Sequence, residues 1–260
     1  MSQPFQDFTS FESIPIKYKF TPDEGPGKYR IGLIVLSNDY TTEQDFINAR
    51  PNSDTAIFVS RVPNSNDCNL DTLPKMAPHI TTATKLIVPE GHLDAIAYAC
   101  TSGTVCMGYD TICSKIHTVR PNVPVITPIT ASLNAFSSFK VRKISVLTPY
   151  ENNVNAAIAK YLEEAGIQIN AFSSFHISDN EVMAALPPDA IFNAAIEANR
   201  ADSEALFISC TAIRAMEVAE SIEREIKKPV ITANQAMIWQ ALRVAGYKKP
   251  VEGFGKILTH

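Results

Sequence analysis

The stretch Leu93–Thr104, with the sequence LDAIAYACTSGT, decides the fold, because an apolar run ends in a cysteine and then breaks into small hydroxyl residues and glycine. Such a run is typical of a buried strand, which here delivers the thiol of Cys100 at its end. The stretch Ser203–Ala212, SEALFISCTA, repeats the pattern around Cys210. The same pattern, a buried strand followed by a cysteine, therefore occurs twice in the chain.

An opening strand and a tetrapeptide extend the repeat on both sides of the cysteines. Tyr29–Leu36 and Lys143–Tyr150 are both apolar runs that end at polar residues. Pro124–Thr127 and Pro229–Thr232 both read Pro-Val-Ile-Thr. We infer an internal duplication, in which each half carries an opening strand, a strand that delivers Cys-Thr, a helix and Pro-Val-Ile-Thr.

Strands alternate with helices along both halves, which predicts two pseudo-symmetric α/β domains with parallel sheets and right-handed crossovers. The expected strands are 29–36, 56–62, 93–100, 124–128, 143–150, 167–175, 204–210 and 229–232. The expected helices begin near 42 and cover 73–88, 105–119, 132–139, 154–165, 188–200, 213–226 and 235–244, with a loop at 178–180. We assign 1–28 to an N-terminal extension, 29–130 to the first half and 131–233 to the second, and expect helix 234–245 to pack back on the first half.

Composition excludes several classes of function. The chain has 260 residues and a net charge of -4, so we expect no nucleic-acid partner. No apolar run approaches the roughly 18 residues that cross a membrane, and no signal pattern opens the chain, so we expect a cytoplasmic protein without a membrane partner. Its five cysteines form no CxxC pair and its five histidines show no ligand spacing, so we expect no metal. No P-loop or dinucleotide fingerprint is present, and we expect no cofactor.

The carboxyl ends of parallel strands form the ligand-binding edge of such sheets. Two halves related by a pseudo-twofold axis would face these edges toward one cleft, so we expect Cys100 and Cys210 to border the same active site. A helix N-terminus beside each thiol would lower its pKa. Backbone N–H groups and the hydroxyls of Thr101, Ser102 and Thr211 would hold a substrate carboxylate. Such thiols could exchange protons on opposite faces of a small acid, or one could add to a double bond while the other supplies a proton.

A lone buried cysteine is more often a small hydrophobic residue than a reactive group. We accept that interpretation for Cys68, Cys106 and Cys113. Cys100 and Cys210 are assigned a function instead, because they occupy matched positions in a duplicated motif.

From Arg30 to the C-terminus the chain resembles the aspartate/glutamate racemase superfamily, whose members combine two α/β domains and take one active-site cysteine from each. Within it, the chain is similar to the branch that holds maleate cis-trans isomerase, arylmalonate decarboxylase and the ectoine-utilisation protein EutA, and to EutA most of all. The motifs that carry the resemblance are Arg30–Val35 (RIGLIV), Asp94–Ser102 (DAIAYACTS), Leu147–Tyr150 (LTPY), Ser209–Ala212 (SCTA) and Asn234–Ala236 (NQA).

The resemblance to maleate isomerase implies a role for each motif. Cys100 would be the nucleophile that adds to the double bond, and Cys210 the acid that protonates the neighbouring carbon. Asn38, Tyr150 and Asn180 match the residues that hold the substrate carboxylates in that family. The resemblance also implies a homodimer, since dimers are common among its members.

Two departures bear on the reaction. Maleate isomerases usually carry Ser-Asn-Thr-Thr after the first strand, whereas Asp39 and Tyr40 separate Asn38 from Thr41 here. Arylmalonate decarboxylases typically place glycine where Cys100 stands, so Cys100 argues against decarboxylation. We therefore expect a cofactor-independent isomerase of a small dicarboxylate or related acid. An amino-acid or hydantoin racemase that uses the same two cysteines is the alternative, and a non-catalytic protein that binds a small acid is another.

Overall fold

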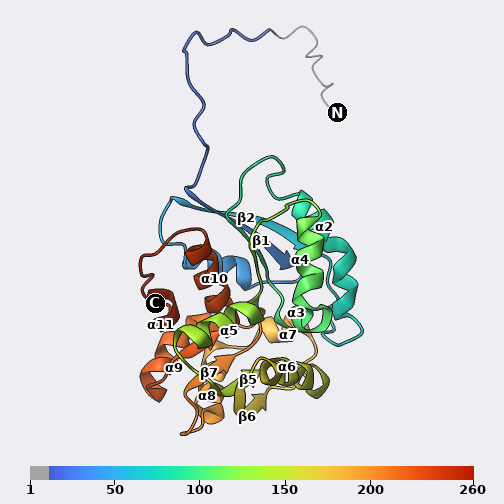
Figure 1. The fold of residues 1–260 in the computed structure, drawn as a ribbon, viewed down its shortest axis with the longest axis vertical. Helices are drawn as coiled ribbons and strands as arrows, with labels where there is room; N and C mark the ends of the chain where they lie inside the picture. The colour runs from blue at the N-terminus through green and yellow to red at the C-terminus, as the bar shows by residue number, and fades with distance from the viewer. Residues whose placement is uncertain (1–11) are drawn as a thin grey trace, which may run out of the picture.

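A computed structural model of the chain describes residues 12–260. Residues 12–28 form an extended segment that runs away from the body of the molecule, which begins at strand β1 (Tyr29–Leu36) (Figure 1). The segment contributes nothing to the core, because its large apolar side chains are exposed; these are Ile14, Ile16, Tyr18 and Phe20. Residues 1–11 of the expected N-terminal extension lie outside the described residues.

The first sheet has the strand order β2-β1-β3-β4, and every pair is parallel. Strand β1 lies between β2 (Thr55–Val62) and β3 (Ala95–Tyr98), with β4 (Val125–Ile126) at the edge. The last six residues of β1 are buried. Helices cover both faces of a parallel sheet, so its central strands are buried on both sides. This explains why the sequence of β1 is an unbroken apolar run.

The second sheet repeats the first. Its order is β6-β5-β7-β8, again with parallel pairs throughout. The strands are β5 (Lys143–Thr148), β6 (Gln168–Ser174), β7 (Ala205–Ile208) and β8 (Val230–Thr232). The shared order confirms the predicted pair of parallel α/β sheets and agrees with the duplication read from the sequence.

Helices connect the strands and cover the sheets (Figure 1). Those before β4 are α1 (Thr42–Asn48), the 3-10 helix η2 (Leu73–Met76), α2 (Ala77–Lys85), α3 (Thr101–Met107) and α4 (Tyr109–His117). Those between β4 and β8 are α5 (Pro128–Ser138), α6 (Asn152–Glu164), α7 (Asn180–Ala184), α8 (Pro188–Ala198), the 3-10 helix η3 (Ala215–Glu217) and α9 (Ala219–Ile226). The chain closes with α10 (Ala233–Val244) and α11 (Lys256–Thr259).

Helix α10 follows the last strand of the second sheet but contacts β1, β3 and β4 of the first sheet, as well as α5. Helices α3 and α6 also pack together across the two halves. The sheets are therefore joined by helix packing on more than one side. Within the described chain, no helix has the length and apolar character needed to cross a membrane.

Three element predictions are wrong in detail. The helix expected at 105–119 is divided into α3 and α4 at Gly108, whose φ of 85° lies in a region that glycine adopts readily. The helix expected at 213–226 begins only at Ala219, after the turn η3, because the preceding residues form the loop that carries Cys210. The loop expected at 178–180 ends at Asn180, which is the first residue of α7.

Candidate active site

Cys100 follows strand β3 and caps the N-terminus of α3. Its Sγ accepts a hydrogen bond from the N–H of Gly103 at 3.2 Å. Glycine suits this turn, because a Cβ there would lie 2.8 Å from Cys100 Sγ and 2.8 Å from the Cε of Met76. The Cys-Thr-Ser-Gly motif thus brings a backbone donor to the sulfur.

Cys210 lies in the loop after β7, and its φ of 151° is rare for a residue with a side chain. The N–H of Ala212 donates to its Sγ at 3.3 Å. The N–H of Ile213 and the hydroxyl of Tyr150 also bond to this sulfur. Helix α9 begins well beyond this loop. The prediction that each thiol adjoins a helix N-terminus therefore holds for Cys100 and is wrong for Cys210.

Both thiols line one small cavity, which has a volume of about 20 Å³. Its walls come from the segments that follow the carboxyl ends of strands in both sheets. The first half contributes Leu36, Asn64, Cys68, Leu73, Cys100 and Ser102. The second half contributes Tyr150, Asn180, Cys210, Thr211 and Ala212.

The structure brings most of the predicted site residues together at this cavity. Those in the walls are Cys100, Ser102, Tyr150, Asn180, Cys210 and Thr211. Asn38 is not in the wall but supports it, because its Oδ1 accepts a hydrogen bond from Asn64 Nδ2 at 2.9 Å. Thr101 is buried outside the wall, and its Oγ1 has no hydrogen-bond partner within residues 12–260.

Five wall residues were not predicted as site residues: Leu36, Asn64, Cys68, Leu73 and Ala212. Cys68 was expected to be purely structural, yet its Sγ lies 3.7 Å from Ser102 Oγ, which lies 3.8 Å from Cys100 Sγ. Asn64 follows the carboxyl end of β2, so the rule that ligands bind at strand ends would have found it, whereas Asn38 was indicated by the resemblance.

The loop that carries Asn64 and Cys68 is bonded to the second half. The N–H of Cys68 donates to the carbonyl oxygen of Ser178 at 2.8 Å. Asn180 Nδ2 donates to the carbonyl oxygens of Ser65 and Asn66 at 3.1 and 2.9 Å. These bonds tie the wall from the first half to the start of α7.

Burial raises the pKa of both thiols, to about 12 for Cys100 and about 11 for Cys210. The main cause is the loss of hydration of the thiolate. Nearby donors oppose it only in part; they include the N–H of Gly103 at Cys100, and Tyr150 and Ala212 at Cys210. The prediction of a lowered thiol pKa is therefore wrong, and both sulfurs are protonated at neutral pH.

The polar groups of the wall are neutral donors and thiols. Asn64, Ser102, Tyr150, Asn180 and Thr211 all carry N–H or O–H groups that can bind carboxylate oxygens. Across the part of the chain that the structure describes, no three His, Cys, Asp or Glu side chains gather closely enough to hold a metal ion. The arrangement therefore suits a small acid bound by hydrogen bonds beside two thiols.

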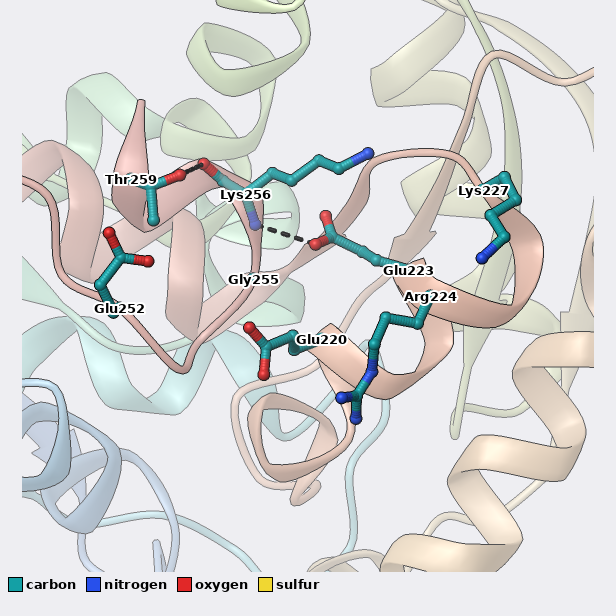
Figure 2. A pocket seen from close by; sticks show the side chains of 8 residues that line it. All are labelled: Glu220, Glu223, Arg224, Lys227, Glu252, Gly255, Lys256 and Thr259. Atoms are coloured by element: carbon teal, nitrogen blue, oxygen red, sulfur yellow. Dashed lines mark hydrogen bonds between the residues drawn. The ribbon is translucent and has the colours of Figure 1, made fainter.

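A larger surface hollow lies between α9 and the C-terminal segment, where charged side chains gather around Glu223 (Figure 2). The Glu223 carboxylate is already engaged, because it accepts hydrogen bonds from the N–H groups of Val230 and Lys256, each at 2.9 Å. This residue fastens the C-terminal segment to β8. We therefore place the candidate site at the cysteine cavity and not in this hollow.

Comparison with known proteins places the chain among enzymes of small acids. Residues 81–258, more than half of the chain, match the family model described as arylmalonate decarboxylase. Maleate isomerase from Alcaligenes faecalis is 25% identical over 246 residues, which cover 89% of this chain and 96% of that protein. Arylmalonate decarboxylase from Bordetella bronchiseptica is 28% identical over 138 residues, covering 52% of this chain and 58% of that protein.

A solved structure agrees with the fold. Nocardia farcinica maleate cis-trans isomerase, in a variant with a covalently bound succinylcysteine intermediate, matches with a TM-score of 0.81 at 21% identity. The match covers 89% of this chain and 98% of that one.

The fold and the cavity together define a class of protein, in which two parallel α/β sheets of the same strand order each deliver one cysteine to a shared cavity. The chain belongs to the arylmalonate decarboxylase family, as the match over residues 81–258 shows. The predicted branch of maleate isomerase and arylmalonate decarboxylase is thereby confirmed. The closer likeness to EutA stays a prediction.

Proposed function

We propose that this protein is a cofactor-independent cis-trans isomerase of a small dicarboxylate such as maleate. The observation that carries the proposal is the meeting of Cys100 and Cys210 at one cavity, since each is delivered by the matching strand of its half. The similarity to a maleate isomerase over 89% of the chain supports the choice of reaction.

In the proposed reaction the Cys100 thiol first loses its proton to solvent. The resulting thiolate adds to one carbon of the double bond, which forms a C–S bond and places an electron pair on the neighbouring carbon. The Cys210 thiol gives its proton to that carbon and becomes a thiolate. Rotation about the resulting C–C single bond converts the cis arrangement into the trans one. Cys210 then removes the proton again, the Cys100 thiolate leaves and the double bond returns, so there is no net gain or loss of electrons.

The intermediate of this scheme is a succinyl group on Cys100. A succinylcysteine intermediate has been captured in the Nocardia farcinica maleate cis-trans isomerase. Because burial raises the pKa of Cys100 to about 12, little of it is thiolate at neutral pH. We therefore expect turnover to increase with pH over the range in which the protein stays folded.

The substrate carboxylates would be held by neutral donors. Ser102 and Thr211 lie next to the two cysteines in the sequence, and Tyr150 and Asn180 complete the wall from the second half. We propose that Asn38 acts through Asn64, the wall residue to which it is bonded. Its effect on substrate binding should therefore be indirect.

Proton NMR of the protein with maleate in heavy water tests the proposal. The wild type is expected to produce fumarate, and Cys100→Ser and Cys210→Ser are expected to produce none. Cys113→Ser is the matched control, because Cys113 is a half-buried cysteine outside the cavity wall and its loss should leave fumarate formation intact.

Other results would replace the isomerase proposal. Deuterium entering the α position of a chiral amino acid or hydantoin, without a change of skeleton, would establish racemase chemistry by the same thiols. Binding of small acids with no turnover, unchanged in Cys100→Ser, would establish a non-catalytic binding protein.

We also propose that the protein forms a homodimer, as the resemblance implies. Each protomer would carry a complete site, because residues of a single chain line the cavity. Sedimentation equilibrium measures the mass directly. A monomer with full fumarate-forming activity would contradict the dimer and leave the proposed reaction standing.

A further inference from the structure

Two peptide groups after Cys210 direct their N–H groups to its sulfur. The N–H of Ala212 donates to Cys210 Sγ at 3.3 Å. The N–H of Ile213 also bonds to the sulfur and favours its charged form. These donors belong to the Thr211–Ala212 and Ala212–Ile213 peptide groups, so whatever fixes those groups also fixes the donors.

Side chains from two distant elements hold the carbonyl ends of the same peptide groups. Asn234 Nδ2 donates to the carbonyl oxygen of Thr211 at 3.0 Å. The Thr42 hydroxyl lies 3.3 Å from the same oxygen, but its one proton goes to Asp39 Oδ2, at 2.6 Å. Thr41 Oγ1 donates to the carbonyl oxygen of Ala212 at 2.7 Å. A trans peptide group is planar, with its C=O and N–H pointing in opposite directions, so a donor that holds the oxygen also sets the direction of the N–H.

The holding side chains are buried and anchored in turn by two carboxylates. Asn234 Nδ2 also donates to Asp45 Oδ2 at 2.7 Å. Asp39 accepts hydrogen bonds from the N–H groups of Thr41 and Thr42, each at 2.8 Å. The start of α1 and the start of α10 are thereby locked against the loop after β7.

We propose that Thr41 and Asn234 are positioning residues for Cys210, because they fix the two peptide groups whose N–H groups stabilise its thiolate. Neither residue lies in the cavity wall. They also account for the backbone at Cys210, since a φ of 151° persists only where the surroundings hold it. Hydrogen bonds in a buried chain polarise one another, so a donor on each carbonyl strengthens the N–H at the other end of the peptide group.

Several ionisable groups face this network. Those that act on the Cys210 thiol are Asp39, Cys68, Cys100 and Tyr150. Asp45 acts one step away, since it bonds to Asn234, and it is itself affected by Asp39 and Glu217. Arg61 lies near Asp39 and favours its charged form. A test must therefore leave all of these groups and their hydrogen bonds in place. Thr41→Val does so, whereas a change at Thr42 would remove the bond from its hydroxyl to Asp39.

The inference rests on the proposed role of Cys210 as proton donor, but its test needs no substrate. The measurement is the rate at which iodoacetamide alkylates Cys210 across a pH series, followed by peptide mass spectrometry. Thr41→Val removes one holding donor and keeps the side-chain shape. Thr41→Ser restores the hydroxyl. Thr84→Val is the matched control, because the buried Thr84 hydroxyl bonds only within α2, to the carbonyl oxygen of Ile80.

We expect Thr41→Val to raise the pKa of Cys210 by about one unit, which slows its alkylation about tenfold at any pH below that pKa. Thr41→Ser and Thr84→Val should keep the wild-type profile. The alkylation of Cys100 in the same samples should not change.

An unchanged Cys210 profile in Thr41→Val would overturn the proposal. So would a change shared equally by Cys100, because it would indicate a general loosening of the fold. Failure of the wild type to convert maleate would overturn the proposed reaction and leave this result untouched, so the two can be separated.

Discussion

The backbone at Cys210 predicts an unusual response to glycine. Its φ of 151° lies where a Cβ is disfavoured, and such a conformation costs of order 1–3 kcal/mol. Glycine has no Cβ and adopts such angles freely. Cys210→Ala and Cys210→Gly both remove the thiol, so a comparison of the two isolates the cost of the Cβ and of the backbone conformation.

The magnitude follows from opposing contributions. At an ordinary buried position glycine is less stable than alanine, by about 0.5–1 kcal/mol of backbone entropy and about 0.8 kcal/mol for the lost methyl group. At Cys210 the release of about 1–3 kcal/mol of strain should offset most of that loss or exceed it. We therefore expect Cys210→Gly to lie between about 0.8 kcal/mol less stable and about 1.7 kcal/mol more stable than Cys210→Ala. Urea denaturation of both variants measures the two free energies of unfolding.

Cys68 offers a matched control, because it is another buried cysteine in a loop of the cavity wall and its φ is not positive. There the glycine variant should be less stable than the alanine variant by about 1–2 kcal/mol. The same order and size of difference at Cys210 would refute the reasoning, because it would mean that the loop carries no backbone strain.

Two further predictions concern titration. Burial raises the pKa of Asp45 from 3.8 to about 7. Its contribution to stability is therefore present below about pH 4 and is lost as the pH rises through about 7, a fall of up to roughly 4 kcal/mol that Asp45→Asn should remove. Chemical denaturation across this pH range measures the free energy of unfolding of the wild type and of Asp45→Asn. The prediction would be contradicted if the two free energies changed in parallel with pH. Because burial raises the pKa of Cys100 to about 12 and that of Cys210 to about 11, alkylation of each should quicken about tenfold per pH unit from neutral pH to about pH 10. A plateau near about pH 8 at either thiol would argue against the burial that the structure shows.

The sheets could be predicted from the sequence because their strands are short, apolar and buried on both faces. The strand predicted at 29–36 coincides with β1, and the repeated Pro-Val-Ile-Thr contains β4 and β8. Helix ends were less predictable. Apolar periodicity runs across Gly108, so only the left-handed backbone at that glycine separates α3 from α4.

The cysteines of the candidate site could be predicted because each ends a strand, and strand ends meet at one edge of a parallel sheet. Leu73 could not, because it follows a long loop whose course depends on its bonds to the second half. The hydrogen-bond network that holds the loop of Cys210 could not be predicted either. Asp45 and Asn234, which are bonded in it, are 189 positions apart and meet only in the folded chain. The direction of the thiol pKa shift depends on the extent of burial, which the motif alone does not reveal.

The most direct test of the central claim is peptide mass spectrometry of Cys210→Ser after incubation with maleate. If Cys100 adds to the double bond and Cys210 only exchanges the proton, one adduct with the mass of maleic acid should form per chain, on Cys100, and Cys100→Ser should carry none. An adduct on Cys68 in place of Cys100, or no adduct from a protein whose wild type forms fumarate, would contradict the claim that the two matched thiols divide the reaction in this way.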